Sequence, residues 1–282
     1  MWGIAAVVSG IFDALLAPFR GMHPAVGLLV ISVIAGVVML LIFGKTSNQK
    51  AIRSAKGRLK AHIAEIWLFR NDIGQMLLAI ARVLIHTGRY FAHSLRPLLF
   101  IFIPVLIIMV MLAVRYEHRP FKVAETAVVS VTVDDPAWTR GDQVQLIAPS
   151  GVEVLSPALR MPAIGQIEWQ IRATDPGRHE VTVRTPRGEV TKRVLVAAEG
   201  QALDKVRDKI AAARGRTFSE AFLLFPAEPP LPSAPGIRAI EVKGWPTRDL
   251  SIFGLGIHWL IVFFAVSLIA GFTVKGIFGV EV

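Results

Sequence analysis

Long apolar stretches and short alternating runs divide the chain into different regions. Three stretches, at 23–44, 97–114 and 250–274, contain no Asp, Glu, Lys or Arg. Crossing a hydrocarbon core of about 30 Å takes roughly 17–25 apolar residues in a helix. A buried core helix would explain one such stretch but not three. The pattern therefore predicts three transmembrane helices, with Pro104 tolerated inside the second.

Helical periodicity is expected on both sides of the first predicted span. Residues 1–22 contain a run of apolar residues interrupted by Asp13, which predicts an interfacial amphipathic segment rather than a cleavable signal peptide. Residues 45–96 have apolar residues at steps of three and four, with a break near Asn71 and Asp72. The spacing predicts a basic cytoplasmic hairpin of two helices that pair as in a coiled coil.

Cationic residues of this hairpin are the candidate site for substrate capture or headgroup contact. In its second half they recur, together with His93, at steps of four and three, which places them on one face of a helix. A solvated or headgroup-facing stripe is the alternative interpretation. The candidates are Lys50, Arg53, Lys56, Lys60, Arg82, His86, Arg89 and Arg96.

Alternation with period two begins after Pro120 and predicts strands. Val129, Val131 and Val133 alternate with polar residues, as do Ile167, Trp169 and Ile171. Turn residues separate these runs. Residues 115–200 are therefore predicted to form an all-β, immunoglobulin-like sandwich outside the cytoplasm. Residues 201–249 are predicted to form a helix followed by a stiff Pro-rich linker.

Charge distribution sets the predicted orientation. The whole chain has 31 Lys and Arg against 21 Asp and Glu, but residues 45–96 hold ten basic and two acidic residues, a net of +8. Short loops rich in Lys and Arg remain in the cytoplasm. We therefore expect a multi-pass protein of the cell inner membrane with its N-terminus outside, the outer domain in the periplasm, and the tail at 275–282 in the cytoplasm. The excess charge favours contact with anionic headgroups, and we expect no DNA partner.

Sequence motifs for covalent chemistry are not found. The chain has no cysteine, no HExxH and no glycine-rich phosphate loop, and its seven histidines are not set among carboxylates at ligand spacing. We therefore expect no enzyme activity, no catalytic residue, no metal and no cofactor. Apart from His23, at the first position of the first predicted span, His258 is the only ionisable residue in a predicted span, and is either functional or a neutral headgroup-facing residue.

The order of these segments resembles the YidC/Oxa/Alb membrane-insertase superfamily, especially its small three-span members, the archaeal YidC-like proteins and the catalytic subunit of the ER membrane complex. The resemblance covers roughly residues 20–117 and 250–282. It is carried by Thr46–Ser47–Asn48–Gln49 after the first span, by the basic helix 50–60, by Glu65–Ile66–Trp67–Leu68–Phe69–Arg70–Asn71–Asp72 at the hairpin tip, and by Leu95–Arg96–Pro97 with Pro104.

The resemblance implies a role in membrane protein biogenesis. The three spans would form a groove that lowers the barrier for entry of a substrate helix, and the basic hairpin would capture the incoming segment. Nascent membrane proteins, the ribosome and other membrane subunits are the candidate partners. The alternative is a non-catalytic envelope scaffold whose outer sandwich recognises a partner or a glycan.

Overall fold

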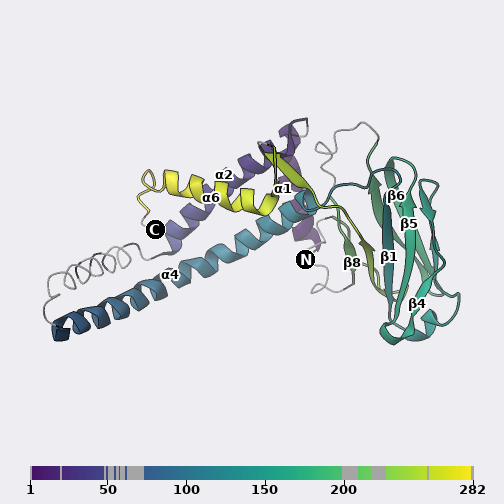
Figure 1. Cartoon of the computed structure of the whole chain (residues 1–282), viewed down its shortest axis with the longest axis horizontal. Coiled ribbons are helices and arrows are strands. Elements are labelled where there is room, and N and C mark those ends of the chain that lie inside the picture. The colour runs from purple at the N-terminus through teal and green to yellow at the C-terminus, as the bar shows by residue number, and fades with distance from the viewer. Residues whose placement is uncertain are drawn as a thin grey trace. The chain divides into compact units, whose positions relative to one another are not determined.

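The computed structural model describes residues 2–19, 21–47, 49, 54, 57, 61, 73–198, 209–216, 227–252 and 254–280. It forms two compact units, Met1–Gly27 with Met109–Trp259, and Leu28–Ile108 with Leu260–Val282. The first unit contains the β-domain, and the second contains most of the apolar helices, which are labelled in Figure 1. The first half of the predicted cytoplasmic hairpin lies almost wholly outside the described residues.

Apolar helices form at the N-terminal segment and at the three charge-free stretches, with boundaries that differ from the predicted ones. They are α1 (Trp2–Leu16, followed by a 3-10 turn, Ala17–Phe19), α2 (Pro24–Thr46), α4 (Ile73–Tyr116) and α6 (Trp259–Val274). Among the described residues, two helices are long and apolar enough to cross a membrane, α2 and the Pro97–Tyr116 part of α4. The second half of the hairpin and the second predicted span are therefore one continuous helix.

The third predicted span begins later than expected. Residues Asp249–Ile252 form β10 and Leu255–His258 form β11, and these two strands pair as an antiparallel hairpin before α6 begins at Trp259. The prediction of a helix from Leu250 is therefore wrong. The lack of charge excluded an exposed loop, but it does not distinguish a strand from a helix. Gly254, at the turn, has φ of +79°, which favours glycine.

The β-domain consists of two antiparallel sheets. The larger has strand order β3-β5-β1-β9-β8, with β4 also paired to β5, and the smaller has order β2-β6-β7. The strands are β1 (Thr126–Val133), β2 (Gln145–Ile147), β3 (Val152–Val154), β4 (Leu159–Met161), β5 (Gln166–Ala173), β6 (Gly177–Thr185), β7 (Gly188–Val196), β8 (Ala213–Gly215) and β9 (Ile237–Lys243), with 3-10 turns at Pro136–Thr139 and Pro162–Ile164. In Figure 1, the paired strands β1 and β5 run side by side.

One hydrophobic core joins the two sheets. It takes Val129 and Val131 from β1, Trp169 from β5, and Val181 and Val183 from β6. The residues of β1 and β5 belong to the alternating runs that predicted strands, so the prediction of these two strands is confirmed. Burial of alternate residues is what a sheet with one covered face requires.

The boundary predicted for the β-domain at residue 200 is wrong. Strand β9 lies in the segment expected to be a linker, yet it pairs with β1 along most of its length, and β8 pairs with β9. Ile237, Ile240 and Val242 of β9 are fully buried. The helix predicted for the first part of 201–249 falls mainly outside the described residues, and β8 begins at Ala213.

Candidate functional site

The structure locates the predicted cationic residues only partly. Lys50, Arg53, Lys56 and Lys60 lie outside the described residues. The backbone at Arg82, His86, Arg89 and Arg96 belongs to α4, so these positions share the regular helix that their spacing predicted. Their role in capture or headgroup contact stays a prediction.

His258 does not lie in a helix. It is the last residue of β11, and its Nε2 lies 3.6 Å from Oε1 of Glu117, which follows α4. The indole N–H of the next residue, Trp259, donates a hydrogen bond of 2.6 Å to the other oxygen of Glu117. His258 is thus part of a polar contact at the ends of α4 and α6, not an isolated ionisable group within a span.

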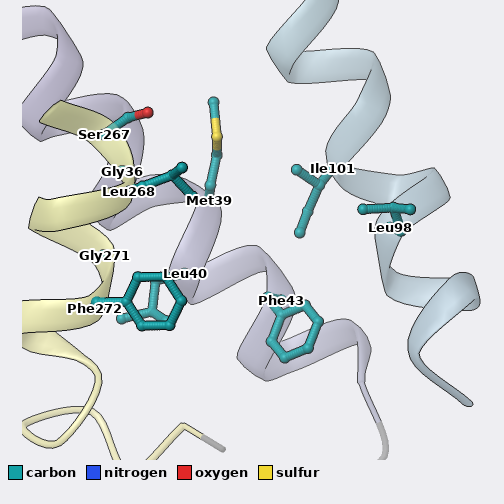
Figure 2. Close-up of a pocket in the computed structure, with 10 residues that line it drawn as sticks. All are labelled: Gly36, Met39, Leu40, Phe43, Leu98, Ile101, Ser267, Leu268, Gly271 and Phe272. Atoms are coloured by element: carbon teal, nitrogen blue, oxygen red, sulfur yellow. The ribbon is translucent and has the colours of Figure 1, made fainter. Parts of the chain in front are cut away.

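A cavity of about 290 Å³ lies between α2, α4 and α6. Figure 2 shows the side chains that line it, with Ile101 of α4 facing Met39 and Phe43 of α2. Leu268 and Phe272 of α6 line the cavity next to α2. The complete lining is Gly36, Met39, Leu40, Phe43, Leu98, Ile101, Ser267, Leu268, Gly271 and Phe272.

The cavity wall is apolar and offers no acid, base or nucleophile arrangement. Its one side-chain hydroxyl, on Ser267, donates to the carbonyl of Phe264 at 3.1 Å within the same helix. The lining positions fall in the last part of α2, at the Pro97 end of the apolar part of α4, and in the last part of α6. By sequence these three ends adjoin the basic 45–96 segment and the C-terminal tail.

Close helix packing forms one wall of this cavity. A Cβ added to Gly36 would lie inside contact distance of the backbone carbonyl of Ser267, and one added to Gly271 would lie 3.5 Å from the carbonyl oxygen of Gly36. Small residues allow this approach, which is common between helices in membranes. The sequence offered a signal for this contact, a glycine inside each of two apolar stretches.

Gly36→Ala is expected to destabilise the protein by about 1–3 kcal/mol, because the added methyl group meets backbone rather than a mobile side chain. The check is the thermal midpoint of helix unfolding in detergent, followed by circular dichroism. Gly88→Ala is the matched control, since a Cβ there meets nothing within 4 Å. Equal midpoints for the two variants would contradict the close packing of α2 and α6.

A buried charged cluster at the end of α4 was missed by the sequence analysis. Arg115, only 2% exposed, donates to Asp13 Oδ1 at 2.6 Å, to the hydroxyl and carbonyl oxygens of Ser9 at 3.0 and 3.2 Å, and to the carbonyl of Met111 at 2.6 Å. Lys209 donates to the other oxygen of Asp13 at 2.7 Å. The cluster joins α1, α4 and the segment before β8.

Two cations determine the protonation of Asp13. Burial by itself would raise its pKa, but the hydrogen bonds and charges of Lys209 and Arg115 outweigh that effect and lower the pKa below its ordinary 3.8. The carboxylate is therefore ionised at neutral pH and holds both cations. Its isolated position in an apolar N-terminal segment was the only sequence signal.

Hydrogen bonds also connect one end each of α2, α4 and α6, within the unit that contains the β-domain. The hydroxyl of Tyr116, the last residue of α4, donates to the carbonyl of Pro24, the first residue of α2, at 3.3 Å. Glu117 connects the end of α4 to Trp259, the first residue of α6. The start of α2, the end of α4 and the start of α6 therefore lie next to one another.

Comparisons with protein families, with curated proteins and with solved structures find no match for this chain. Among the residues that the structure describes, no group of three His, Asp or Glu side chains could hold a metal ion.

Proposed function

We propose that the protein is an integral membrane protein with three spans, α2, the Pro97–Tyr116 part of α4, and α6. A helix of 23 residues such as α2 is about 34 Å long, and the 16 residues of α6 cover about 24 Å. A thinner bilayer around the shorter helix accommodates the difference. The basic 45–96 segment faces the cytoplasm and the β-domain faces the outside.

Exposed apolar side chains on these helices support the proposal. A soluble protein rarely leaves large contiguous apolar surfaces uncovered, whereas lipid covers them in a membrane. The exposed residues include Leu29, Val33, Ile34, Val38 and Leu41 of α2, Leu98, Leu99, Phe100, Phe102, Ile103 and Ile107 of α4, and Ile261, Phe264, Leu268, Ile269 and Phe272 of α6.

Helix α1 also exposes apolar side chains and buries a polar one, which fits a position in the membrane interface. Its exposed face carries Val7, Ile11 and Leu15, at steps of four, while Ser9 is buried and holds Arg115. A water-exposed helix would place the polar residues outward. An apolar outer face on a helix whose polar groups point inward is stabilised by acyl chains.

Within the membrane, we assign an insertase-like role to the cavity between α2, α4 and α6. The single observation that carries this assignment is the place of the cavity, at the helix ends that adjoin the basic segment. An incoming helix would first meet Lys50, Arg53, Lys56, Lys60, Arg82 and Arg89 at the cytoplasmic surface. Its apolar side chains would then dock in the cavity before they enter lipid.

The contribution of such a site is physical rather than covalent. A charged residue at the bilayer centre costs about 2.5–3.5 kcal/mol on insertion scales. A cavity that binds the apolar part of a segment lowers the free energy of the intermediate in which its polar part is still at the surface. The apolar wall fits a hydrophobic helix and does not fit a polar substrate.

The β-domain is proposed to be an immunoglobulin-like sandwich in which a later strand of the same chain occupies the place of the first strand. In that fold one sheet has strand order A-B-E-D and the other C-F-G. Here β9-β1-β5-β3 and β2-β6-β7 follow the same orders, with β1 as strand B and β6–β7 as the F–G hairpin. Strand A comes first in the chain in the standard fold, whereas its place is taken here by β9, which follows the other strands.

Recognition of an outer partner by this domain is the second candidate function. It is favoured by Leu159 and Ile164, which are 59% and 61% exposed on β4 and on the 3-10 turn that follows it. Exposed apolar patches mark protein contact surfaces, and on this alternative these two side chains would belong to such a patch. On this alternative the helices only anchor the domain.

Photo-cross-linking during membrane protein synthesis tests the insertase-like proposal against this alternative. With a photoreactive amino acid at Met39 or Leu268, both in the cavity wall, we expect adducts with newly made membrane proteins. At Leu99, 69% exposed on α4 outside the cavity lining, we expect adducts with lipid.

Two results would contradict the proposal. Substrate adducts of equal yield at Leu99 and at the cavity positions would mean that the cavity is not selective. Protein adducts at Leu159 with none at Met39 or Leu268 would favour the outer-partner function instead.

A further inference from the structure

The β10–β11 hairpin has one aliphatic face. Its register pairs Leu250 with Ile257 and Ile252 with Leu255, and side chains alternate between the two faces of a strand. The side chains of Leu250, Leu255 and Ile257 therefore share one face, and Asp249, Gly256 and His258 share the other. A Cβ added to Gly256 would lie 3.4 Å from Cβ of Asp249, as expected for neighbours on one face.

Protein covers this aliphatic face only at the base of the hairpin. Leu250 is 2% exposed, whereas Leu255, beside the turn, is 66% exposed. In the described part of the chain, the hairpin is a two-stranded sheet by itself, and neither strand pairs with another sheet. The apolar face is thus buried at Leu250, at the base, and uncovered at Leu255, at the tip.

The base of the hairpin is fixed at the outer helix ends. His258 lies beside Glu117, and Trp259 donates to Glu117 and begins α6 directly, without a linker. Tyr116 ties the same end of α4 to the start of α2. Tyr and Trp are enriched at the level where membrane helices leave the lipid. The hairpin therefore begins at the boundary that the proposed spans define.

We propose that the β10–β11 hairpin lies in the outer interface of the lipid bilayer, with its aliphatic face toward the acyl chains. The outer backbone groups of a two-stranded hairpin need water or headgroups as hydrogen-bond partners, so the hydrocarbon core is excluded. The interface satisfies both requirements, because it offers polar partners to the backbone and apolar contact to Leu255. The inference rests on the proposed spans but not on insertase activity.

Site-directed fluorescence quenching tests this placement, and the chain is well suited to it because it contains no cysteine. Leu255→Cys carries an environment-sensitive fluorophore in the full-length protein, reconstituted into phosphatidylcholine–phosphatidylglycerol vesicles. We expect blue-shifted emission, strong quenching by lipids with a nitroxide near the headgroup, and weak quenching by aqueous iodide. Leu159→Cys is the exposed aliphatic control on the β-domain and should be quenched by iodide.

Leu99→Cys, labelled in the same way, reports separately on the spans. It lies two residues inside the Pro97 end of its proposed span, so it should be quenched best by a nitroxide high on the acyl chains and only weakly by iodide. Iodide quenching at Leu255 equal to that at Leu159, with Leu99 still in lipid, would overturn the hairpin proposal alone. Protection of Leu255 from both quenchers would also overturn it, because protein, such as a second copy of the chain, would then cover the tip. Iodide quenching at Leu99 would overturn the proposed spans together with this inference.

Discussion

Lys192→Met is expected to lower the free energy of unfolding of the β-domain by about 3–5 kcal/mol, the usual cost of breaking a buried ion pair from one side. Nζ of Lys192 is fully buried, 2.5 Å from Oε2 of Glu228 and 2.7 Å from the carbonyl oxygen of Ala211. Methionine fills a similar volume but leaves the Glu228 carboxylate buried without its cation.

Glu228 also protects the edge of the smaller sheet. Its Oε1 accepts the backbone N–H of Arg193 at 2.9 Å, on the edge strand β7. Arg214 donates to the carbonyl of Thr191 on the same strand. Uncovered edges are sites where other chains can pair. We therefore expect the Lys192→Met protein to aggregate more readily on heating.

Burial acts on the charge of Lys192 as well. It lowers the pKa of this amine, and the attraction of Glu228 opposes the shift without cancelling it. A double variant, Lys192→Met with Glu228→Leu, removes both charges and should regain much of the lost stability, because no unpaired charge then remains.

The measurement is denaturant unfolding of the full-length protein in detergent, followed by tryptophan fluorescence, since Trp138, Trp169 and Trp245 lie in the β-domain core. Lys243→Met is the matched control. Its amine pairs with Glu168 at 2.7 Å but is about half-exposed, so the loss should be below about 1 kcal/mol. Equal losses for both variants would show that the buried pair contributes no more than a surface pair.

Local patterns in the sequence were sufficient to predict several strands and the approximate position of the apolar helices. Alternation at Val129–Val133 and at Ile167–Ile171 depends on one face of a strand being buried, which the sequence reports directly. The Pro-rich composition around residues 226–236 predicted a linker, and it concealed β9, which begins at Ile237 immediately after these prolines. Pairing of β9 with β1 is a long-range contact that no local pattern encodes.

The hairpin and the charged cluster were missed for a related reason. A run without charges indicates an apolar environment, but the choice between strand and helix at Leu250–Ile257 depends on the glycines at 254 and 256 and on the partner strand. Asp13 and Arg115 are about a hundred positions apart in sequence, and single residues of opposite charge give no periodicity to detect. The cavity residues are apolar like their neighbours, so only the helix packing distinguishes them.

Arg115→Met is expected to release α1 from the end of α4. Arg115 supplies hydrogen bonds to both Ser9 and Asp13, and these connect helices far apart in sequence. We expect a loss of about 3 kcal/mol, at the lower end for a buried ion pair, because Asp13 keeps Lys209 as a partner. Arg172→Met, at an exposed pair with Glu153, should cost less than about 1 kcal/mol.

Thiol labelling measures the release of α1 directly. Ser9 is buried, so a cysteine at this position should react slowly with a water-soluble maleimide in the parent protein and faster after Arg115→Met. Acid should also release α1. Because maleimide needs the thiolate, this arm uses a dithiodipyridine, which still reacts with thiols at low pH. The folded-state pKa of Asp13 is lowered, so its contribution to stability is present above the unfolded value near 3.8 and is lost as the pH falls through the folded-state pKa. A labelling rate that does not change with either treatment would mean that Arg115 and Asp13 do not hold α1 in place.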